Sequence, residues 1–380
     1  MRILYVAQNI LVPGTNGGST HVTEVTRALR KGHEVMVMAR RGSTGEGVVG
    51  VGVGSPPGII RQAVAPLLFP VAYPYARRFR PQVIYERYSS FGLGVLLGRA
   101  MHVPVVSMIL DRSATRLTLA GADALVATAP EIVPARYRDK VIEVSWGANI
   151  SMFRPDVDGR DLRAQIGFSA DDIVVGYTGA FYPWHGLDTL VESAILLDRD
   201  PRAAHVRYLL VGDGECRRRV EAAIAASGVR QRFVLVGKVP YEEVPRYIAA
   251  SDVGMAPYNP AAHPQFREGF HFDPLKVFEY MAAARATVTV DSPNMRKMFT
   301  DRQEALLVKA GDADALARAT LDLVVDPNLR ARLAEQGRRL VVDRYSWQAH
   351  GRQLGEVFSA VVSAARPPDR TLVQHRRGEG

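Results

Sequence analysis

Short apolar runs alternate with amphipathic segments along this chain, and the first forty residues show the pattern clearly. Residues 2–7 are mostly apolar, which predicts a buried strand. A glycine-rich loop follows, and from residue 19 to residue 29 apolar side chains recur at helical spacing. A second apolar run comes at residues 33–38. Strand, glycine loop, helix and strand in this order predict the opening of a doubly wound α/β sheet.

The same pattern continues to residue 144 and starts again at residue 172. Apolar runs predict strands at residues 82–85, 103–109, 122–127 and 141–144, and then at 172–178, 206–211, 232–236 and 252–258. We therefore expect two Rossmann-like, doubly wound domains, residues 1–154 and 155–347, with a linker that begins near Phe153. Residues 366–380 are polar and basic, which predicts a disordered tail.

A helix is predicted after Asp273, where the chain reads Asp-Pro-Leu-Lys-Val-Phe-Glu-Tyr-Met-Ala-Ala. Aspartate followed by proline is typical of a helix start, with the carboxylate as N-cap and Pro274 at the first helical position. Leu275, Phe278 and Ala282 recur at three- and four-residue spacing and should form one stripe that faces a core.

Lys276 and Glu279 share another face of that helix. A lysine in the first turn is unfavourable for the helix dipole unless an anion docks there. Two interpretations stay open at this point. The pair belongs to a phosphate site, or it is a solvated lysine beside a surface carboxylate.

Composition indicates a globular protein of a reducing compartment. The chain has 380 residues, of which 47% are apolar and 23% charged, and its one cysteine is Cys216. A single cysteine cannot form an intramolecular disulfide, so we expect a cytoplasmic location. No apolar run is long enough for a signal segment or a membrane span.

The net charge of +9 lies entirely in the N-terminal half. Residues 1–155 carry 18 lysines and arginines against 9 acidic residues, whereas the remainder carries 30 of each. A basic half attracts phosphates, anionic lipid surfaces or acidic acceptors. Nucleic acid is not expected, because the basic residues are scattered without interleaved surface aromatics.

Residues 58–76 form an apolar segment that contains three prolines and leads to Arg77, Arg78 and Arg80. An apolar patch beside three arginines suggests peripheral contact with a membrane surface, such as the inner face of a cell membrane. The alternative is a helix that packs on the sheet and has a solvated basic end.

No metal site or protein nucleophile is expected. Two Asp-x-Asp strings, at residues 156–158 and 312–314, fall at predicted loops or helix starts, where aspartate caps are common. No Ser/His/Asp or Cys/His arrangement stands out. The alternating Gly50, Gly52 and Gly54 do not follow a strand and open a helix, so they are not a dinucleotide fingerprint. We expect an edge strand there.

Two separate strings carry a resemblance to a known family. The segment at residues 272–283 and the segment at residues 17–35, which begins Gly-Gly-Ser-Thr-His-Val and ends Gly-His-Glu-Val, resemble retaining glycosyltransferases of family 4. The resemblance implies the GT-B fold, in which two Rossmann-like domains face a central cleft and the last helix, here residues 348–365, crosses back to the first domain. It also implies transfer of a sugar from a nucleotide-diphospho-sugar to a hydroxyl of a small metabolite, a glycan or a lipid-linked glycan, without metal or further cofactor.

The resemblance assigns roles residue by residue. It places the donor diphosphate at Gly17, Gly18, His185 and Lys276, and the donor sugar at His271, Phe272 and Asp273. It places the nucleotide ribose at Glu279 and the base near Lys238, Val239 and Tyr258, with Arg87, Asp111 and Asn149 on the acceptor side. No catalytic residue is assigned, because in this family the leaving phosphate is thought to help deprotonate the acceptor.

The chain departs from the family pattern at several positions. The usual diphosphate-binding arginine and lysine are Ala180 and His185 here, and the usual first glutamate is His271. The glycine that normally ends the helix is Ala284, so we expect a locally different turn. Many relatives also carry a histidine near the end of the strand at residues 103–109. This chain has Ser107 and Asp111 there, so no histidine base is assigned.

These departures leave two rival functions open. A sugar-nucleotide epimerase of the same fold uses carboxylates and histidines around the anomeric carbon, for which Glu268 and His271 are the candidates. A non-catalytic partner subunit would explain the losses at residues 180, 185 and 271. The connection from residue 111 to residue 121 is short, which predicts a trimmed helix and a more open acceptor cleft.

Overall fold

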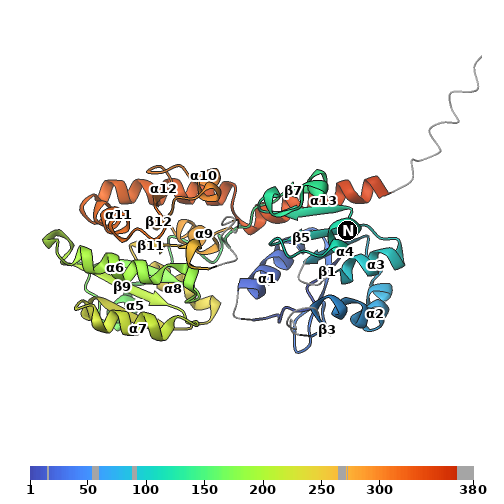
Figure 1. Cartoon of the computed structure of the whole chain (residues 1–380), viewed down its shortest axis with the longest axis horizontal. Helices are drawn as coiled ribbons and strands as arrows, with labels where there is room; N and C mark the ends of the chain where they lie inside the picture. Colours follow the sequence, from blue (N-terminus) through green and yellow to red (C-terminus); the bar gives the residue numbers. More distant parts are fainter. Residues whose placement is uncertain (15–16, 54–59, 88–91, 264–270, 272, 366–380) are drawn as a thin grey trace, which may run out of the picture. The chain divides into compact units, whose positions relative to one another are not determined.

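The computed structural model describes residues 1–14, 17–53, 60–87, 92–263, 271 and 273–365 (Figure 1). The chain forms two compact units, which are Met1–Val144 with Gly351–Gly380 (unit 1) and Ser145–His350 (unit 2). The predicted disordered tail, residues 366–380, lies outside the described residues.

Unit 1 is built on a seven-stranded parallel sheet with the strand order β3-β2-β1-β4-β5-β6-β7. Its strands are β1 (Arg2–Val6), β2 (Glu34–Arg40), β3 (Val48–Gly52), β4 (Val83–Arg87), β5 (Val105–Ile109), β6 (Ala124–Ala127) and β7 (Val141–Glu143). Its helices are α1 (Gly17–Leu29), α2 (Ile60–Phe79), α3 (Leu93–Met101) and α4 (Arg116–Gly121), with short 3-10 turns η2 (Pro130–Ile132) and η3 (Ala135–Lys140). The strand order is that of a doubly wound sheet, as the sequence predicted.

The two faces of this sheet are covered by different helices, because successive strand residues point to opposite sides. Leu4 and Ile84 share a buried apolar cluster with residues of α2 and α3. On the other face, the Tyr5 hydroxyl lies 3.3 Å from His21 of α1, and the Tyr85 and Phe358 rings lie 5.3 Å apart. Phe358 belongs to α13 (Trp347–Ala365), so the last helix packs on the sheet of unit 1.

Helix α2 runs from residue 60 to residue 79 without a break, although prolines occur at positions 66, 70 and 74. The sequence predicted an apolar segment interrupted by these prolines. Ala72 and Ala76 are fully buried and join the core cluster of unit 1. Arg77 and Arg78 at its end are exposed, so this is a helix on the sheet with a basic end.

Two local expectations for unit 1 are confirmed. Strand β3 lies at one edge of the sheet, and α4 has only six residues, as expected for a trimmed helix. A side chain on Gly52 would lie 1.7 Å from the carbonyl oxygen of Gln8, so only glycine allows this edge strand to approach so closely.

Unit 2 has a six-stranded parallel sheet with the order β10-β9-β8-β11-β12-β13. Its strands are β8 (Ile173–Thr178), β9 (Val206–Val211), β10 (Phe233–Gly237), β11 (Val253–Ala256), β12 (Ala286–Val290) and β13 (Leu306–Val308). Its helices are α5 (Arg160–Gln165), α6 (Leu187–Leu197), α7 (Arg217–Ala226), α8 (Val244–Ala249), α9 (Leu275–Ala282), α10 (Pro293–Met298), α11 (Ala313–Val325) and α12 (Pro327–Asp343). Short 3-10 turns are η4 (Pro183–His185), η5 (Pro201–Ala203), η6 (Arg230–Arg232), η7 (Tyr241–Glu243) and η8 (Pro260–Ala262).

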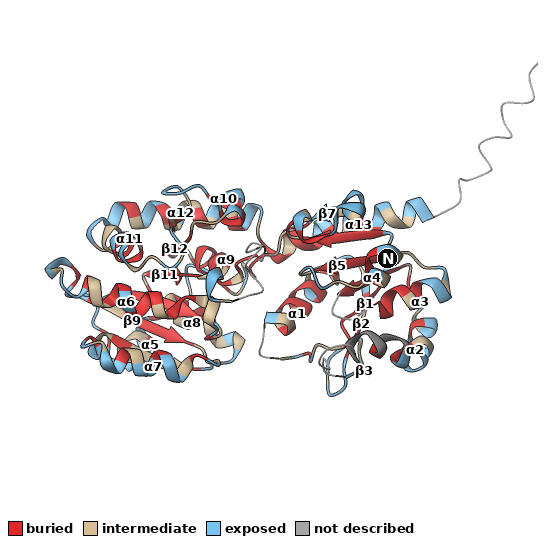
Figure 2. Cartoon of the chain, viewed as in Figure 1, coloured by how far each residue is buried: buried red, intermediate tan, exposed pale blue. Residues whose placement is uncertain are grey.

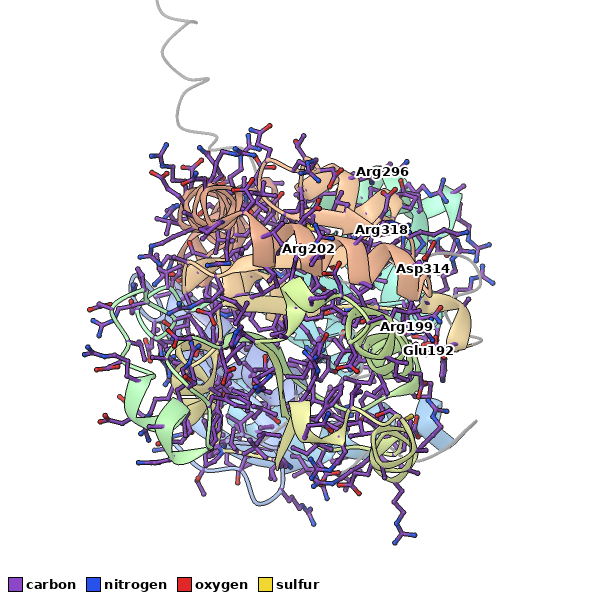
Figure 3. All side chains as sticks on the ribbon, turned by 90° about the vertical axis from the view of Figure 1, so that its left-hand side faces the viewer. Glu192, Arg199, Arg202, Arg296, Asp314 and Arg318 are labelled. Atoms are coloured by element: carbon purple, nitrogen blue, oxygen red, sulfur yellow. The ribbon has the colours of Figure 1, made fainter. Side chains whose placement is uncertain are left out.

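Burial follows the sheets in both units. The central strands are almost continuously buried, whereas the edge strands β3, β7 and β10 are partly exposed, and helices show one buried and one exposed side (Figure 2). On the face of unit 2 that Figure 3 presents, Glu192, Arg199, Asp314 and Arg318 lie at the surface, so charges of both signs are interspersed there. This agrees with the balanced charge of the C-terminal half.

Residues 145–153 belong to unit 2, whereas we expected the first domain to extend to residue 154. The backbone N–H of Trp146 donates a hydrogen bond to the carboxylate of Asp273, and Ala148 forms a β-bridge with Ser346. Phe153 is fully buried in an apolar cluster with Phe278. These tertiary contacts, rather than the position of the linker in the sequence, set the boundary.

Candidate functional site

The sheet of unit 2 changes winding direction between β8 and β11. From β8 the chain proceeds to β9 on one side, and from β11 it proceeds to β12 on the other. In open α/β sheets, ligands bind outside the carboxyl ends of the strands at this switch point. Here the two strands end at Thr178 and Ala256, and α9 begins beside them. The described residues at this edge form the candidate site.

The start of α9 differs from the sequence prediction. The helix begins at Leu275 with Pro274 in the N-cap position, and no side chain caps it. The carboxylate of Asp273 accepts a hydrogen bond from the backbone N–H of Trp146 at 2.5 Å instead. The carboxylate of Asp273, which the local sequence predicted as the N-cap of this helix, therefore binds the backbone of Trp146 and not the helix N-terminus.

Tyr280 fixes α9 against the end of β8. Its hydroxyl accepts hydrogen bonds from the backbone N–H and the side chain of Thr178, at 2.8 and 3.1 Å. A side chain on Gly254 would overlap the Tyr280 ring at 2.3 Å, so glycine in β11 makes room for it. The predicted stripe is only partly correct, because Leu275 is half-buried while Val277 is fully buried.

Lys276 is the central residue of the site. Its side chain is buried, with 8% of the residue exposed. Its Nζ donates a hydrogen bond to the Tyr177 hydroxyl at 2.9 Å and lies 4.0 Å from the centroid of the same ring. It also lies 5.3 Å from the Tyr258 ring centroid. Among the described residues no carboxylate forms an ion pair with it, so a buried ammonium faces the switch point with hydrogen-bond capacity to spare.

Gly179 leaves the space that Lys276 fills. A side-chain carbon on Gly179 would lie 2.9 Å from Nζ of Lys276, and its backbone has a φ of +136°, which L side chains rarely adopt. The lysine from α9 therefore occupies the volume beside the loop that follows β8. Residue 180, which follows Gly179, is alanine here, so this position of the loop carries no positive charge of its own.

Burial lowers the pKa of Lys276 to about 7, and the nearby charge of Glu279 opposes that shift. Lys276 is therefore expected to lose its proton near neutral pH when no anion is bound. A bound anion stabilises the charged form of a neighbouring amine, so an anion at this edge would raise the pKa of Lys276.

His185, which was also predicted to contact the diphosphate, differs from Lys276 in its protonation state. Its Nδ1 is in hydrogen-bond contact with the Ala180 carbonyl and lies 3.0 Å from the Tyr177 hydroxyl. Burial, reinforced by the charge of Lys276, lowers the pKa of His185 to about 3. A neutral imidazole that donates through Nδ1 to a carbonyl has only an acceptor at Nε2. It would have to gain a proton to donate to a phosphate oxygen.

Glu279 is half-buried on α9, one turn after Lys276. Its Oε1 accepts a hydrogen bond from the Tyr241 hydroxyl at 3.3 Å, which orients the carboxylate. Lys238 and Val239 directly follow β10, at the same edge of the sheet, and Lys238 is exposed. Tyr258 is buried and follows β11. The structure therefore brings the predicted nucleotide residues to one edge of unit 2.

The predicted donor-sugar residues are only partly described. His271 is half-buried, and Asp273 is buried next to Trp146. Phe272 and Glu268 lie outside the described residues. The roles assigned to these residues stay predictions.

The predicted site residues of unit 1 lie at the carboxyl edge of its own sheet. Gly17 and Gly18 are the first residues of α1 rather than part of the preceding loop, and the space beside Gly17 is open. Arg87 ends β4 and is buried, with its guanidinium 3.3 Å from His21. Asp111 accepts a hydrogen bond from the backbone N–H of Ser113 at 2.7 Å, which is a turn contact.

Asn149 was placed on the acceptor side, but it is a buried residue of unit 2. Its side-chain oxygen accepts hydrogen bonds from the backbone N–H groups of Ser151 and Met152, both at 3.2 Å. Those contacts give it a structural role in the turn before Phe153. Its placement on the acceptor side stays a prediction.

The acidic pairs considered for metal binding are engaged elsewhere. Asp156 and Asp158 form ion pairs with neighbouring arginines, and Asp312 caps α11 by accepting from the backbone of Ala315. Among the described residues, no group of three or more histidine, cysteine or acidic side chains is arranged to hold a metal ion. Metal independence stays a prediction.

Three residues of the site were not found from the sequence. Tyr177, Gly179 and Tyr280 position Lys276, yet a tyrosine inside an apolar run or a helix stripe carries no distinctive local signal. The sequence predicted the strand at residues 172–178 and singled out Lys276, but it did not show that Lys276 fills the space beside Gly179.

The comparison with protein families decides the class of this unit. The family described as Glycosyl transferases group 1 matches residues 172–326, which includes β8, α9 and the whole candidate site. This part of the chain is similar to that family. The predicted resemblance is supported for the part that contains the string at residues 272–283, whereas the string at residues 17–35 lies outside the matched range.

Curated proteins with similar sequences are glycosyltransferases. The alpha-D-kanosaminyltransferase of Streptomyces kanamyceticus is 25% identical over 59% of this chain and 55% of its own length. The GDP-mannose-dependent alpha-(1-6)-phosphatidylinositol monomannoside mannosyltransferase of Mycolicibacterium smegmatis is 26% identical over 56% of this chain and 54% of its own. The matching part of the chain thus spans about half the length of these relatives.

Solved structures establish the fold of the full chain. Sucrose-phosphate synthase from Thermosynechococcus elongatus has a TM-score of 0.78 at 20% identity, covering 96% of this chain and 100% of that protein. Anabaena HepE in complex with UDP-glucose has a TM-score of 0.74 at 17% identity, covering 95% of this chain and 100% of HepE. The predicted α/β fold of the GT-B class is confirmed.

None of the helices within the described residues is both long and apolar enough to cross a bilayer.

Proposed function

We propose that the chain is a retaining glycosyltransferase that moves a sugar from a nucleotide-diphospho-sugar to an acceptor hydroxyl. The observation that carries this proposal is the buried ammonium of Lys276, which faces the switch point of the group 1 unit without a carboxylate partner among the described residues. A diphosphate supplies the negative charge that such a group lacks.

We assign a different part of the nucleotide-sugar donor to each residue at this edge. Lys276 stabilises the leaving diphosphate, and Glu279, oriented by Tyr241, accepts hydrogen bonds from the ribose hydroxyls. Lys238, Val239 and Tyr258 lie where the base would dock. In unit 1, Gly17 and Gly18 open α1, whose N-terminus favours an anion, and Arg87 marks the acceptor side.

The reaction is proposed to proceed on one face of the sugar. The bond between the anomeric carbon and the diphosphate oxygen breaks, and a bond from the acceptor oxygen to the same carbon forms. The acceptor proton passes to an oxygen of the departing phosphate, so no protein carboxylate is required as base. Closure of a cleft that excludes water would favour transfer over hydrolysis.

A donor screen tests this proposal. The chain is incubated with UDP-, GDP- and ADP-sugars, with and without a pool of candidate acceptors, and released nucleotide and products are followed by mass spectrometry. Nucleotide release that depends on acceptor supports the transferase. Epimerised donor without net release would instead identify the epimerase, and failure to bind any nucleotide would identify a non-catalytic partner subunit.

We also propose that transfer needs no metal ion, because Lys276 supplies the positive charge at the diphosphate. Activity should survive an excess of EDTA. Loss of activity in EDTA with recovery in manganese or magnesium would overturn this part of the proposal.

We further propose a cytoplasmic enzyme whose unit 1 makes peripheral contact with an anionic membrane. The whole excess of positive charge lies in residues 1–155, and exposed apolar residues of α2 lead into Arg77 and Arg78. An acceptor that is anionic, or that is presented at an anionic surface, would be drawn to this unit.

A further inference from the structure

A hollow of about 730 Å³ lies at the end of α2, on the edge of the unit 1 sheet where strands begin. Arg2 and Glu34, which line it, are the first residues of β1 and β2 and are paired in register. This edge is opposite to the carboxyl ends of the same strands, where Gly17 and Arg87 lie. The hollow is therefore separate from the proposed substrate site of unit 1.

Its lining is strongly basic. Four arginines and one carboxylate face the hollow, which leaves three uncompensated positive charges. Within the part of the chain that the structure describes, none of these arginines forms an ion pair. The lining residues are Arg2, Glu34, Tyr73, Pro74, Arg77, Arg78, Phe79 and Arg80. Its size is in the range of ordinary small-ligand sites.

Arg80 has an unusual backbone conformation. It follows the last residue of α2 with a φ of +52°, in the left-handed region where glycine is the favoured residue. Its N–H donates to the Ala76 carbonyl, and its own carbonyl accepts from the Arg2 side chain at 2.8 Å. His102 and Ala284 have the same conformation after other helices, so it is a helix-end turn that residues other than glycine also adopt in this chain. At the end of α2 this turn brings Arg80 to the hollow beside Arg77 and Arg78.

The surface next to the hollow is apolar. Leu67, Val71 and Tyr75 recur at four-residue spacing on α2 and are 73%, 38% and 47% exposed. Pro74 and Arg78, one turn further along this exposed side, line the hollow. The sequence Ile60–Phe79 contains no acidic residue. One side of α2 thus passes from exposed apolar side chains to arginines along its axis.

We propose that this hollow binds the phosphate group of an anionic phospholipid headgroup, while Leu67, Val71 and Tyr75 enter the lipid interface. Guanidinium forks match phosphate oxygens in pairs, which suits a cluster of arginines better than diffuse attraction does. Neither a basic patch nor a small apolar patch alone anchors a protein well, but the two together do. This inference rests on the proposed membrane contact of unit 1 and names the group that makes it.

Co-sedimentation with lipid vesicles tests the inference without donor or acceptor, so its outcome is independent of glycosyltransfer. The full chain is mixed at low ionic strength with vesicles of phosphatidylcholine alone or with phosphatidylglycerol added. We expect binding only when phosphatidylglycerol is present. Arg77→Ser with Arg80→Ser should reduce the bound fraction about tenfold or more. Arg41→Ser with Arg136→Ser removes the same charge from exposed sites of unit 1 and should retain most binding.

Four results would overturn the inference. Equal loss in both double variants would indicate net charge alone, and unchanged binding of Arg77→Ser with Arg80→Ser would exclude the hollow. Full binding by Arg77→Lys with Arg80→Lys would show that a guanidinium fork is not needed. Glycerol 3-phosphate, followed by calorimetry, checks for a soluble ligand, and tight binding of it without vesicle binding would also contradict a lipid site. Thermal melting of each variant verifies folding.

Discussion

The ammonium of Lys276 and the ring of Tyr177 meet in two ways at once, through a 2.9 Å hydrogen bond to the hydroxyl and a 4.0 Å approach to the ring centroid. The ring stabilises the cation by its quadrupole, while burial opposes the charge. Burial is the larger influence and, opposed by the charge of Glu279, lowers the pKa of Lys276 to about 7.

Donor binding should therefore take up a proton above neutral pH. A diphosphate favours the charged lysine and raises its pKa, so affinity for UDP or GDP should be greatest below pH 7 and should fall by up to about tenfold per pH unit above it. Calorimetry in two buffers of different ionisation enthalpy measures the proton uptake. Lys276→Arg keeps the charge but does not titrate, so its affinity should be flat from pH 7 to 9. An equal pH slope in that variant would exclude Lys276 as the titrating group.

Gly179→Ala should weaken the donor site. The new methyl group would lie 2.9 Å from Nζ of Lys276 and must displace it, so we expect the donor KM to rise about tenfold, equivalent to about 1.4 kcal/mol. Gly167→Ala is the matched control, because Gly167 has a φ of +83° but nothing within 4 Å of the added carbon. The control should lose about 1 kcal/mol of stability with an unchanged KM. A similar rise in KM for both variants would show that the effect is global strain.

Glu279→Ala should raise the donor KM with little change in folding. It removes a charged hydrogen-bond acceptor from a half-buried surface and no core packing, which costs about 1.5–3 kcal/mol of binding. Tyr241→Phe removes only the group that orients the carboxylate and should have a smaller effect. Steady-state kinetics against donor and a thermal melt check both. A collapsed melting temperature with normal donor binding of the remaining folded protein would contradict the assigned role.

Glu86 predicts a pH dependence of stability in unit 1. Burial raises its pKa to about 7, although the backbone N–H of Gly94 and neighbouring groups hydrogen-bond to the carboxylate. The unfolded chain releases this proton near pH 4.5 and the folded chain near pH 7, so stability should fall as pH rises through that window, by about 3 kcal/mol in total. Hydrogen exchange of β4 and α3 peptides at pH 5 and pH 8, corrected for intrinsic exchange rates, measures it.

Glu86→Gln should abolish that dependence and stabilise unit 1 at pH 8 but not at pH 4. Glu46→Gln, at an exposed position, serves as the control and should change neither value. If the Glu86→Gln variant kept the wild-type slope, another group would be responsible.

Much of the fold was predictable from the sequence because strands and helices each give a characteristic spacing of apolar residues over a few positions. Buried parallel strands appear as apolar runs, and the glycine loop before α1 and the Asp-Pro string before α9 mark element starts. What the pattern missed was set by partners far away in sequence. The sequence predicted Asp273 as an N-cap, but its carboxylate accepts a hydrogen bond from the N–H of Trp146, 127 residues away in sequence. Ala284 was expected to change the turn, yet it keeps the left-handed conformation at a φ of +53°, held by hydrogen bonds around the helix end.

The candidate site was predictable only as a set of residue types. Lys276 and Glu279 stood out because a lysine in a first turn is unfavourable without an anion. The burial of Lys276 could not be predicted, since it depends on Tyr177, Tyr258 and the missing side chain at Gly179. The exposed side of α2 could not be predicted either, because three prolines in the sequence argue against one continuous helix.

Carrying the cation on α9 has a consequence for how this protein could diversify. A helix anchored by Tyr280 holds the ammonium in place without an ion-pairing side chain from the neighbouring loop. The exposed Tyr182 of that loop can then vary without loss of the positive charge, whereas Phe181 is part of the core. Laboratory evolution aimed at new sugar donors should tolerate changes at Tyr182, and should tolerate few at Gly179, Tyr177 and Tyr280.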